Sequence, residues 1–454
     1  MHPLPISKQS KQASAGPADQ PALWRQLQAA GAVLRAQRAG QSGSAALEAV
    51  DPFLRPGVQA LAFTVWRNLG RAMALRDALA AKTPPAAVDA LLCVTLALCW
   101  DADSAPYDEF TLVNQAVEAV KRDPRTAGQA AFVNACLRRF LRERVHLVAL
   151  TDASPQAQWN HPAWWIKRLQ AEQPQRWQSI LQASNAQAPL TLRVNLRKTS
   201  LAAFMGALAQ APMAARAVAP ATVYLERAVA VARVPGYAQG WFSVQDAAAQ
   251  RAAPLLLDGL SLGPQSRVLD ACAAPGGKTG HLLESTSAQV IALEQDPARI
   301  PRIHANLQRL DLRAQVVTGD AGDPAAWWDG QLFDAVLLDA PCTASGIVRR
   351  HPDVRWLRRE ADIAQLAQSQ KRLLDALWPL LRVGGRLLYC TCSVFAQEGP
   401  QQLQAFLTRH SDARALPADG SLWPRSAEAG AIVLDNAAYD HDGFFYGLLE
   451  KHPA

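Results

Sequence analysis

The spacing of apolar residues distinguishes two regions in the first half of the chain. Over residues 21–150 apolar side chains recur at helical spacing, and Val113, Val117 and Val120, for example, fall on one helical face. Residues 151–235 open with an aromatic helical stretch and continue with short alternating strands and an Ala-rich helix. The pattern therefore predicts an all-α domain followed by a small α+β module.

Apolar strands and amphipathic helices alternate from residue 236 to residue 454. The strands are predicted at 266–271, 289–294, 314–318, 333–338 and 385–389. The helices are predicted at 278–284, 297–310, 363–381 and 397–410. This alternation predicts a parallel sheet covered by helices on both faces, a Rossmann-like α/β domain. An apolar segment at 443–449 predicts one further strand, at the edge of the sheet.

Composition fits a multidomain globular protein. The 454 residues are 50% hydrophobic and 19% charged, and the net charge of +7 favours a polyanionic partner. Residues 90–100 form the longest apolar run, which is too short to span a membrane. Residues 1–20 are polar, which predicts a disordered tail rather than a secretory signal. We expect a cytoplasmic monomer with no membrane partner.

Seven cysteines with no Cys-x-x-Cys pair argue against a disulfide scaffold and a zinc ribbon. We expect no bound metal. Cys93, Cys99 and Cys136 fit buried, small apolar positions.

A Gly-rich turn follows the first strand of the α/β domain, at residues 270–279, and leads into a helix. This is the usual place for a nucleotide-like ligand. A phosphate-binding P-loop would need Gly five residues before Gly277, where Cys272 stands, and the G-x-G-x-x-G dinucleotide fingerprint is absent. Both alternatives are therefore excluded.

Four consecutive strands of the predicted sheet end in an acid: Asp270, Glu294, Asp320 and Asp339. An acid at the end of the second strand can accept both ribose hydroxyls of an adenosine, and Asp320 follows the third strand, near the adenine edge. Acids attract a sulfonium and repel a triphosphate. The set therefore favours S-adenosylmethionine as the cofactor.

Two cysteines follow adjacent strands of the same sheet, Cys342 after the fourth and Cys392 after the fifth. Such a pair suits methylation of a pyrimidine at carbon 5, because a thiolate that adds to carbon 6 makes carbon 5 nucleophilic. A second group then removes the carbon-5 proton. The residues alone leave the roles of the two cysteines interchangeable.

Three segments, 270–279, 339–342 and 391–393, resemble signature motifs of the RNA 5-methylcytosine methyltransferases. Further segments resemble that family at 240–246, 349–353 and 442–445. Residues 113–117 and 132–139 resemble the helical domain of the transcription antitermination factor NusB. A NusB-like domain ahead of this catalytic core is the layout of family members that modify 16S, small-subunit, ribosomal RNA. The resemblance covers nearly the whole chain after residue 20.

The resemblance implies specific roles. S-adenosylmethionine would be held by a set of residues at the strand ends: Cys272, Ala273, Ala274, Pro275, Gly276, Gly277, Lys278, Glu294, Asp320 and Asp339. Cys392 would be the nucleophile and Cys342 would assist product release, while Asp339 would bridge cofactor and base and Lys278 would face the base. The sequence departs from the family pattern at Glu294, where Asp is usual, and at Ala321, where Gly is usual.

Basic residues suggest how ribosomal RNA is held. Arg349 and Arg350 begin a basic loop after Cys342, which we expect to clamp phosphates around a flipped nucleotide. Arg193 and Lys198 would extend this track. A further phosphate-binding face is expected on one side of the helix at 129–144, formed by Arg138, Arg139 and Arg142.

Two other functions compete with this one. The same chemistry on transfer RNA would need the same motifs, and only the NusB-like domain favours ribosomal RNA. A non-catalytic RNA-binding or ribosome-assembly protein could keep the fold, but the presence of both Cys342 and Cys392 argues against it.

Overall fold

The computed structural model describes residues 21–424 and 440–453, so the predicted tail at 1–20 lies outside the described residues. The chain forms two compact units, the first ending at Gln158 and the second beginning at Trp159. No helix in the described ranges is long and apolar enough to cross a membrane, and the same residues contain no cluster of His, Cys, Asp or Glu that could hold a metal.

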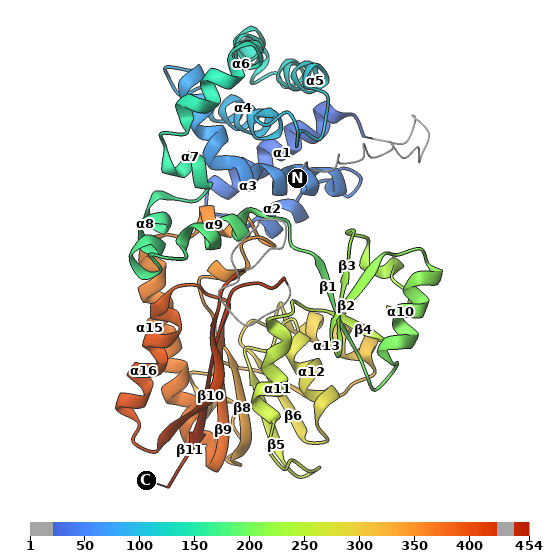
Figure 1. The fold of residues 1–454 in the computed structure, drawn as a ribbon, viewed down its shortest axis with the longest axis vertical. Helices are drawn as coiled ribbons and strands as arrows, with labels where there is room; N and C mark the ends of the chain where they lie inside the picture. The colour runs from blue at the N-terminus through green and yellow to red at the C-terminus, as the bar shows by residue number, and fades with distance from the viewer. Residues whose placement is uncertain (1–20, 425–439, 454) are drawn as a thin grey trace, which may run out of the picture. The chain divides into compact units, whose positions relative to one another are not determined.

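The first unit is all helical, as predicted (Figure 1). Its helices are α1 (Leu23–Arg38), α2 (Gly43–Glu48), α3 (Arg55–Leu79), α4 (Ala86–Cys99), α5 (Glu109–Arg122) and α6 (Ala130–Thr151), with α7 (Pro155–Trp159) at the boundary. Helix α4 is apolar on nearly every side and buried from Val88 to Cys99. It contacts α1, α3, α5 and α6, so it forms the centre of this unit's core.

The second unit begins with the α+β module. Its elements are α8 (Ala163–Glu172), α9 (Trp177–Asn185), β1 (Leu190–Val194), α10 (Leu201–Gln210), β2 (Ala215–Ala219), β3 (Thr222–Leu225) and β4 (Phe242–Val244). The four strands form an antiparallel sheet in the order β2-β3-β1-β4. Because β4 pairs with β1, this sheet extends past the boundary predicted at residue 235.

The α/β domain contains one seven-stranded sheet, in the order β10-β11-β9-β8-β5-β6-β7. Its strands are β5 (Arg267–Ala271), β6 (Gln289–Glu294), β7 (Gln315–Thr318), β8 (Phe333–Asp339), β9 (Leu381–Thr391), β10 (Ala413–Leu422) and β11 (Phe444–Lys451). Strands β5 to β9 are parallel, whereas β10 and β11 are antiparallel to their neighbours.

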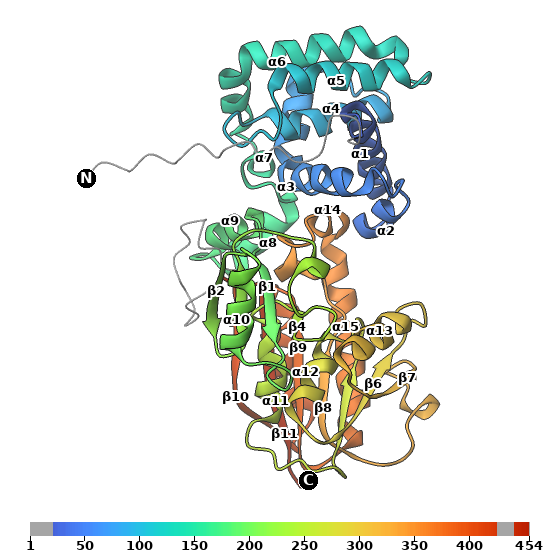
Figure 2. The same cartoon turned by 90° about the vertical axis from the view of Figure 1, so that its right-hand side faces the viewer.

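Helices cover both faces of this sheet, as the alternation predicted (Figure 2). They are α11 (Ala252–Leu257), α12 (Gly277–Ser285), α13 (Ile300–Leu310), α15 (Glu360–Leu377) and α16 (Pro400–Arg409), while the short helix α14 (Val354–Leu357) packs in a separate apolar cluster with α8 and α9. Two apolar layers result, one packed with α11, α12 and α13 and the other with α15 and α16. Adjacent residues such as Val268 and Leu269 face opposite layers, and both are fully buried.

The observed elements of this domain differ from the predicted ones at three places. The segment 443–449 does not form an edge strand, because β11 lies between β9 and β10. Strand β10 was not predicted, since its run of Arg, Pro, Asp and Gly has no strand-like alternation. The helix predicted to reach Leu381 ends at Leu377, followed by a 3₁₀ turn that contains Pro379 and by the start of β9.

Candidate active site

The carboxyl ends of four parallel strands meet at one edge of the sheet. Strands β7, β6, β5 and β8 are neighbours in that order, and they end at Thr318, Glu294, Ala271 and Asp339. This topology brings the residues that follow each strand together, and such an edge is where open α/β sheets bind ligands.

Two backbone amides of the Gly-rich turn after β5 donate hydrogen bonds to β6, one to a backbone carbonyl and one to a side chain. The Ala273 amide donates to the Leu293 carbonyl at 2.9 Å, and the Ala274 amide donates to Oε2 of Glu294 at 3.0 Å. Gly276 has φ +94°, a left-handed conformation that favours glycine. A Cβ added at Gly277 would meet nothing within 4 Å, so the first turn of α12 faces open space.

The acids at this edge differ in their exposure and in the hydrogen bonds that each carboxylate already accepts from the protein. Glu294 is only 4% exposed and accepts the amides of Ala274 and Asp296. Asp320 is more open, and its hydrogen bonds with Arg372 hold the pKa of its carboxyl below the usual range. Both carboxylates retain acceptor capacity for ribose or adenine groups.

Asp270, in contrast, has no exposed surface. It accepts a hydrogen bond from the Thr279 hydroxyl at 2.6 Å. Burial, with a further contribution from the charge of Asp339, raises the pKa of Asp270 to about 7. Asp270 therefore interacts with the other charged residues of this edge but offers a ligand no exposed carboxylate.

Asp339 and Lys278 form an ion pair at the end of β8, with Nζ and Oδ2 at 2.7 Å. Burial lowers the pKa of Lys278, but the charge and hydrogen bond of Asp339, together with smaller contributions from Cys390 and Cys392, outweigh this and the net shift is upward. The other Asp339 oxygen lies 3.5 Å from the Cys390 sulfur, and the Lys278 ammonium lies 5.3 Å from the Phe444 ring centroid. Lys278 therefore stays charged, in contact with Asp339.

Cys342 and Cys392 face each other, with their Sγ atoms 3.4 Å apart. Backbone bonds join their two loops, since the Gly346 amide donates to the Cys392 carbonyl at 2.9 Å. The hydrogen bond with Cys392 and burial raise the pKa of the Cys342 thiol. The structure thus brings the two sequence-predicted cysteines together beside the cofactor edge.

Comparison with known proteins identifies the family. Residues 259–450 match the family described as 16S rRNA methyltransferase RsmB/F, and residues 161–232 match the ferredoxin-like domain of RsmF/B-like methyltransferases. The Vibrio cholerae ribosomal RNA small subunit methyltransferase B is 39% identical over 93% of this chain and 96% of its own length. The Escherichia coli K12 protein of the same name is 43% identical over 73% of this chain and 75% of its own.

The chain belongs to the RsmB/F family of ribosomal RNA methyltransferases. It is accordingly an S-adenosylmethionine-dependent enzyme of small-subunit ribosomal RNA.

Solved structures share the fold of this RsmB/F-family chain. The crystal structure of PH0851 covers 94% of the chain and 99% of its own, with a TM-score of 0.71 at 23% identity. A methyltransferase homologue from Pyrococcus horikoshii covers 65% of the chain and 97% of its own, with a TM-score of 0.54 at 25% identity.

The first two arginines of the loop after Cys342, Arg349 and Arg350, are already paired with acids of the protein, so the expectation that they bind phosphate is corrected. The Arg349 side chain is fully buried and pairs with Asp442. Arg350 donates to Asp442 at 2.6 Å and to Asp246 at 2.8 Å. Three of the family-like segments, 240–246, 349–353 and 442–445, therefore meet in a buried ion-pair network.

The same correction applies to Arg193. It is 2% exposed, pairs with Glu284 and donates to Oε1 of Gln245 at 2.6 Å, so it links the α+β module to α12. Lys198 is partly exposed and lies 3.3 Å from Asp311. In the first unit, by contrast, Arg138, Arg139 and Arg142 are exposed on α6.

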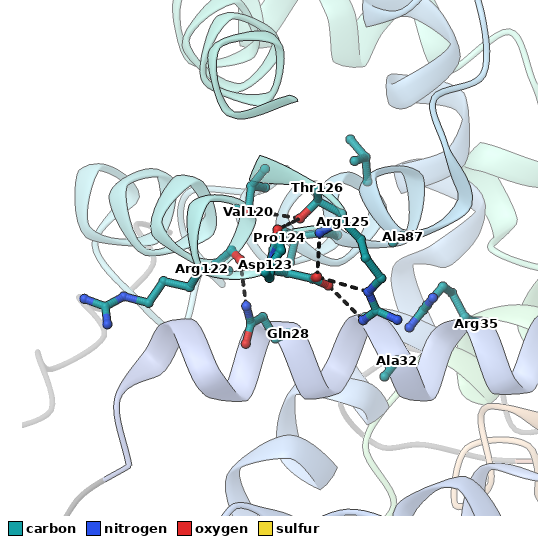
Figure 3. A pocket seen from close by; sticks show the side chains of 14 residues that line it. Gln28, Ala32, Arg35, Ala87, Val120, Arg122, Asp123, Pro124, Arg125 and Thr126 are labelled. Carbon is teal, nitrogen blue, oxygen red and sulfur yellow. Dashed lines mark hydrogen bonds and ion pairs between the residues drawn. The ribbon is translucent and has the colours of Figure 1, made fainter. Parts of the chain in front are cut away.

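A separate cavity of about 290 Å³ opens in the first unit between α1, α4 and α5 (Figure 3). Small apolar residues, including Gly31, Ala32 and Ala87, line it. Its charged lining residues are Arg35, Arg122, Asp123 and Arg125. Arg125 pairs with Asp123 at 2.9 Å, and the close-up places Arg35 beside that pair. This cavity was not predicted, because its lining residues come from three helices and from the turn after α5.

Glu398 is a site residue that sequence analysis missed. It stands in the 3₁₀ turn Ala396–Glu398 and is fully buried between the two cysteine loops. In the sequence it is one acid among polar residues at a predicted helix start, the position where a solvated acid is common. Only the contacts in the folded chain separate it from such residues.

Proposed function

We propose that this enzyme transfers a methyl group from S-adenosylmethionine to carbon 5 of a cytosine in 16S ribosomal RNA, through a covalent cysteine adduct. The observation that carries the proposal is the Cys342–Cys392 pair, whose sulfurs lie 3.4 Å apart at the ends of adjacent strands. One thiol would attack the base while the other stays within reach of the same ring.

S-Adenosylmethionine supplies an electrophilic methyl group on a positively charged sulfur. The residues present fit it: the open first turn at Gly277 admits a ligand, and Glu294 and Asp320 offer acceptors for hydroxyl and amine groups. Acidic Asp339 suits a cation nearby, although Lys278 already pairs with it. Residues 272–278 would form the wall against which the cofactor lies.

In the proposed chemistry, the Cys392 thiolate adds to carbon 6 of the cytosine, and a carbon–sulfur bond forms as carbon 5 gains electron density. After carbon 5 has been methylated, its proton leaves to a base and the electron pair expels the Cys392 sulfur. Cys342 assists this release. Asp339 and Lys278 would orient the base, which must be unpaired or flipped to reach both sulfurs.

RNA binding is proposed for the helical unit. Exposed Arg138, Arg139 and Arg142 on α6 offer phosphate contacts. The cavity lined by Arg35, Arg125 and small apolar residues would add a further contact, to a base and its phosphate.

The test is methyl transfer from labelled S-adenosylmethionine to small-subunit ribosomal RNA, with transfer RNA as the competing substrate. Nucleoside analysis should find the label in 5-methylcytidine from ribosomal RNA. Label in another nucleoside would contradict the chemistry, and label in transfer RNA alone would contradict the substrate.

A further inference from the structure

The Glu398 carboxylate accepts hydrogen bonds from both cysteine loops. From the loop after Cys342, the Thr343 amide donates to Oε1 at 2.9 Å and the Thr343 hydroxyl to Oε2 at 2.5 Å. From the loop after Cys392, the Ser393 hydroxyl donates to Oε2 at 2.6 Å. The residue next to each cysteine is therefore tied to one carboxylate.

A fourth donor completes the set. Nε2 of Gln370 on α15 lies 3.2 Å from Oε1. Burial raises the pKa of the Glu398 carboxyl, and the hydrogen bonds from Ser393, Thr343 and Gln370 oppose that shift. Four donors on two oxygens match the acceptor capacity of an ionised carboxylate, whereas the hydrogen of a protonated carboxyl would compete with one of the donors. The Glu398 backbone is fixed too, because its carbonyl accepts the Tyr389 hydroxyl at 2.6 Å.

We propose that Glu398 is a positioning residue for the methyl-transfer reaction: its carboxylate locks the two cysteine loops together and keeps Cys342 as the thiol that donates a hydrogen bond to Cys392. This proposal rests on the proposed function. Glu398 touches neither sulfur in a hydrogen bond, so it acts through Thr343 and Ser393.

The negative charge of Glu398 also favours the protonated form of the Cys342 thiol. Together with the larger effects of Cys392 and burial, it raises the pKa of the Cys342 thiol. Other charged or titratable groups near the two sulfurs are Tyr389 of β9, which interacts electrostatically with Cys342, and Lys278 of α12, which interacts electrostatically with Cys392. Arg358 donates to the Thr343 carbonyl at 3.0 Å. The proton is thereby held on Cys342.

The experiment compares Glu398→Gln and Glu398→Ala in the full chain. Alkylation of each cysteine by iodoacetamide is followed against pH by peptide mass spectrometry, since only the thiolate reacts. In Glu398→Gln, which keeps the shape and removes the charge, the alkylation midpoint of Cys342 should move to lower pH. In Glu398→Ala, kcat should fall on the order of 100-fold with little change in KM, because misplacement by about 1 Å has that cost.

Gln402→Ala is the matched control. Gln402 is also buried, on the following helix, and its side chain donates to the Ala367 carbonyl, away from both cysteine loops. It should lose stability without moving the Cys342 alkylation profile. An unchanged Cys342 profile and an unchanged kcat in Glu398→Gln would overturn the proposal, even if Glu398→Ala fails to fold. If wild-type protein makes no 5-methylcytidine but the alkylation shift is seen, the proposed chemistry fails and the placement of Glu398 stands.

Discussion

The strand-end edge and the arginine loop at 346–359 both carry polar residues close to Cys342 and Cys392. The two regions differ in how exposed those polar side chains are. At the edge, Asp320 and Asp339 keep part of each side chain exposed. In the loop, Arg349 and Arg355 are fully buried, and Arg350 is tied to two acids. The acids at the edge are accessible to a ligand, whereas Arg349, Arg350 and Arg355 hold segments of the chain together.

This difference explains what the sequence could predict. The order of strands places the acids, because the ends of neighbouring parallel strands share an edge whatever the side chains do. Arg349 depends instead on Asp442, which lies 93 residues further along the chain. Nothing near Arg349 in the sequence distinguishes an arginine that binds phosphate from one that binds a distant acid.

The same reasoning applies to Asp270 and Glu398. Asp270 follows the strand-end pattern, but it stands one residue before the end of β5 and its side chain is fully buried. Glu398 gathers donors from Thr343, Gln370 and Ser393, which belong to three separate segments. The local sequence pattern predicts where helices and strands lie and end, whereas a buried polar network can be recognised only in the folded chain.

The largest expected effect is on the arginine loop. Asp442→Asn removes the charge that pairs with buried Arg349 and should lower the free energy of unfolding by about 3–5 kcal/mol. The matched variant, Asp419→Asn, breaks the more exposed pair with Arg251 and should cost less than about 1 kcal/mol. Urea unfolding measures both. If Asp442→Asn instead bound RNA more weakly and kept its stability, Arg349 and Arg350 would be RNA-binding residues after all.

The strand-end edge should respond in ligand binding instead. Asp320→Ala should weaken S-adenosylmethionine binding by roughly 1–3 kcal/mol, because hydrogen bonds to the cofactor are lost. Asp329 is the control, since it also pairs with an arginine, Arg267, but at the opposite end of β5. Calorimetric titration measures the S-adenosylmethionine affinity of both alanine variants. Equal affinities of the two variants would show that Asp320 does not bind the cofactor.

Asp270 should make the free energy of unfolding depend on pH. Its pKa is raised to about 7 in the folded protein, so the folded chain retains a proton that the unfolded chain releases above its ordinary pKa of 3.8. Wild-type stability should therefore fall, relative to Asp270→Asn, as pH rises from about 4 to about 7, and the difference should then level off. Unfolding curves at several pH values test this. A difference independent of pH would mean that Asp270 is not protonated in the fold.

The smallest expected effect comes from the exposed arginines of α6 in the helical unit. Alanine at Arg138, Arg139 and Arg142 should weaken RNA binding and flatten its salt dependence, by about one unit of slope per lost phosphate contact. Cofactor affinity should not change. RNA titrations at several salt concentrations measure the slope, and an unaltered slope would show that this face is only solvated.

The most direct test of the proposed chemistry is a denaturing gel of protein incubated with RNA and S-adenosylmethionine. Cys392→Ala should give no shifted band and no methylation, because the attacking thiol is gone. Cys342→Ala should give a shifted band, since attack and methylation proceed while release stalls. The 3.4 Å separation of the two sulfurs allows either assignment in space, so the gel decides between them. A shifted band for Cys392→Ala and none for Cys342→Ala would reverse the roles proposed for the two cysteines.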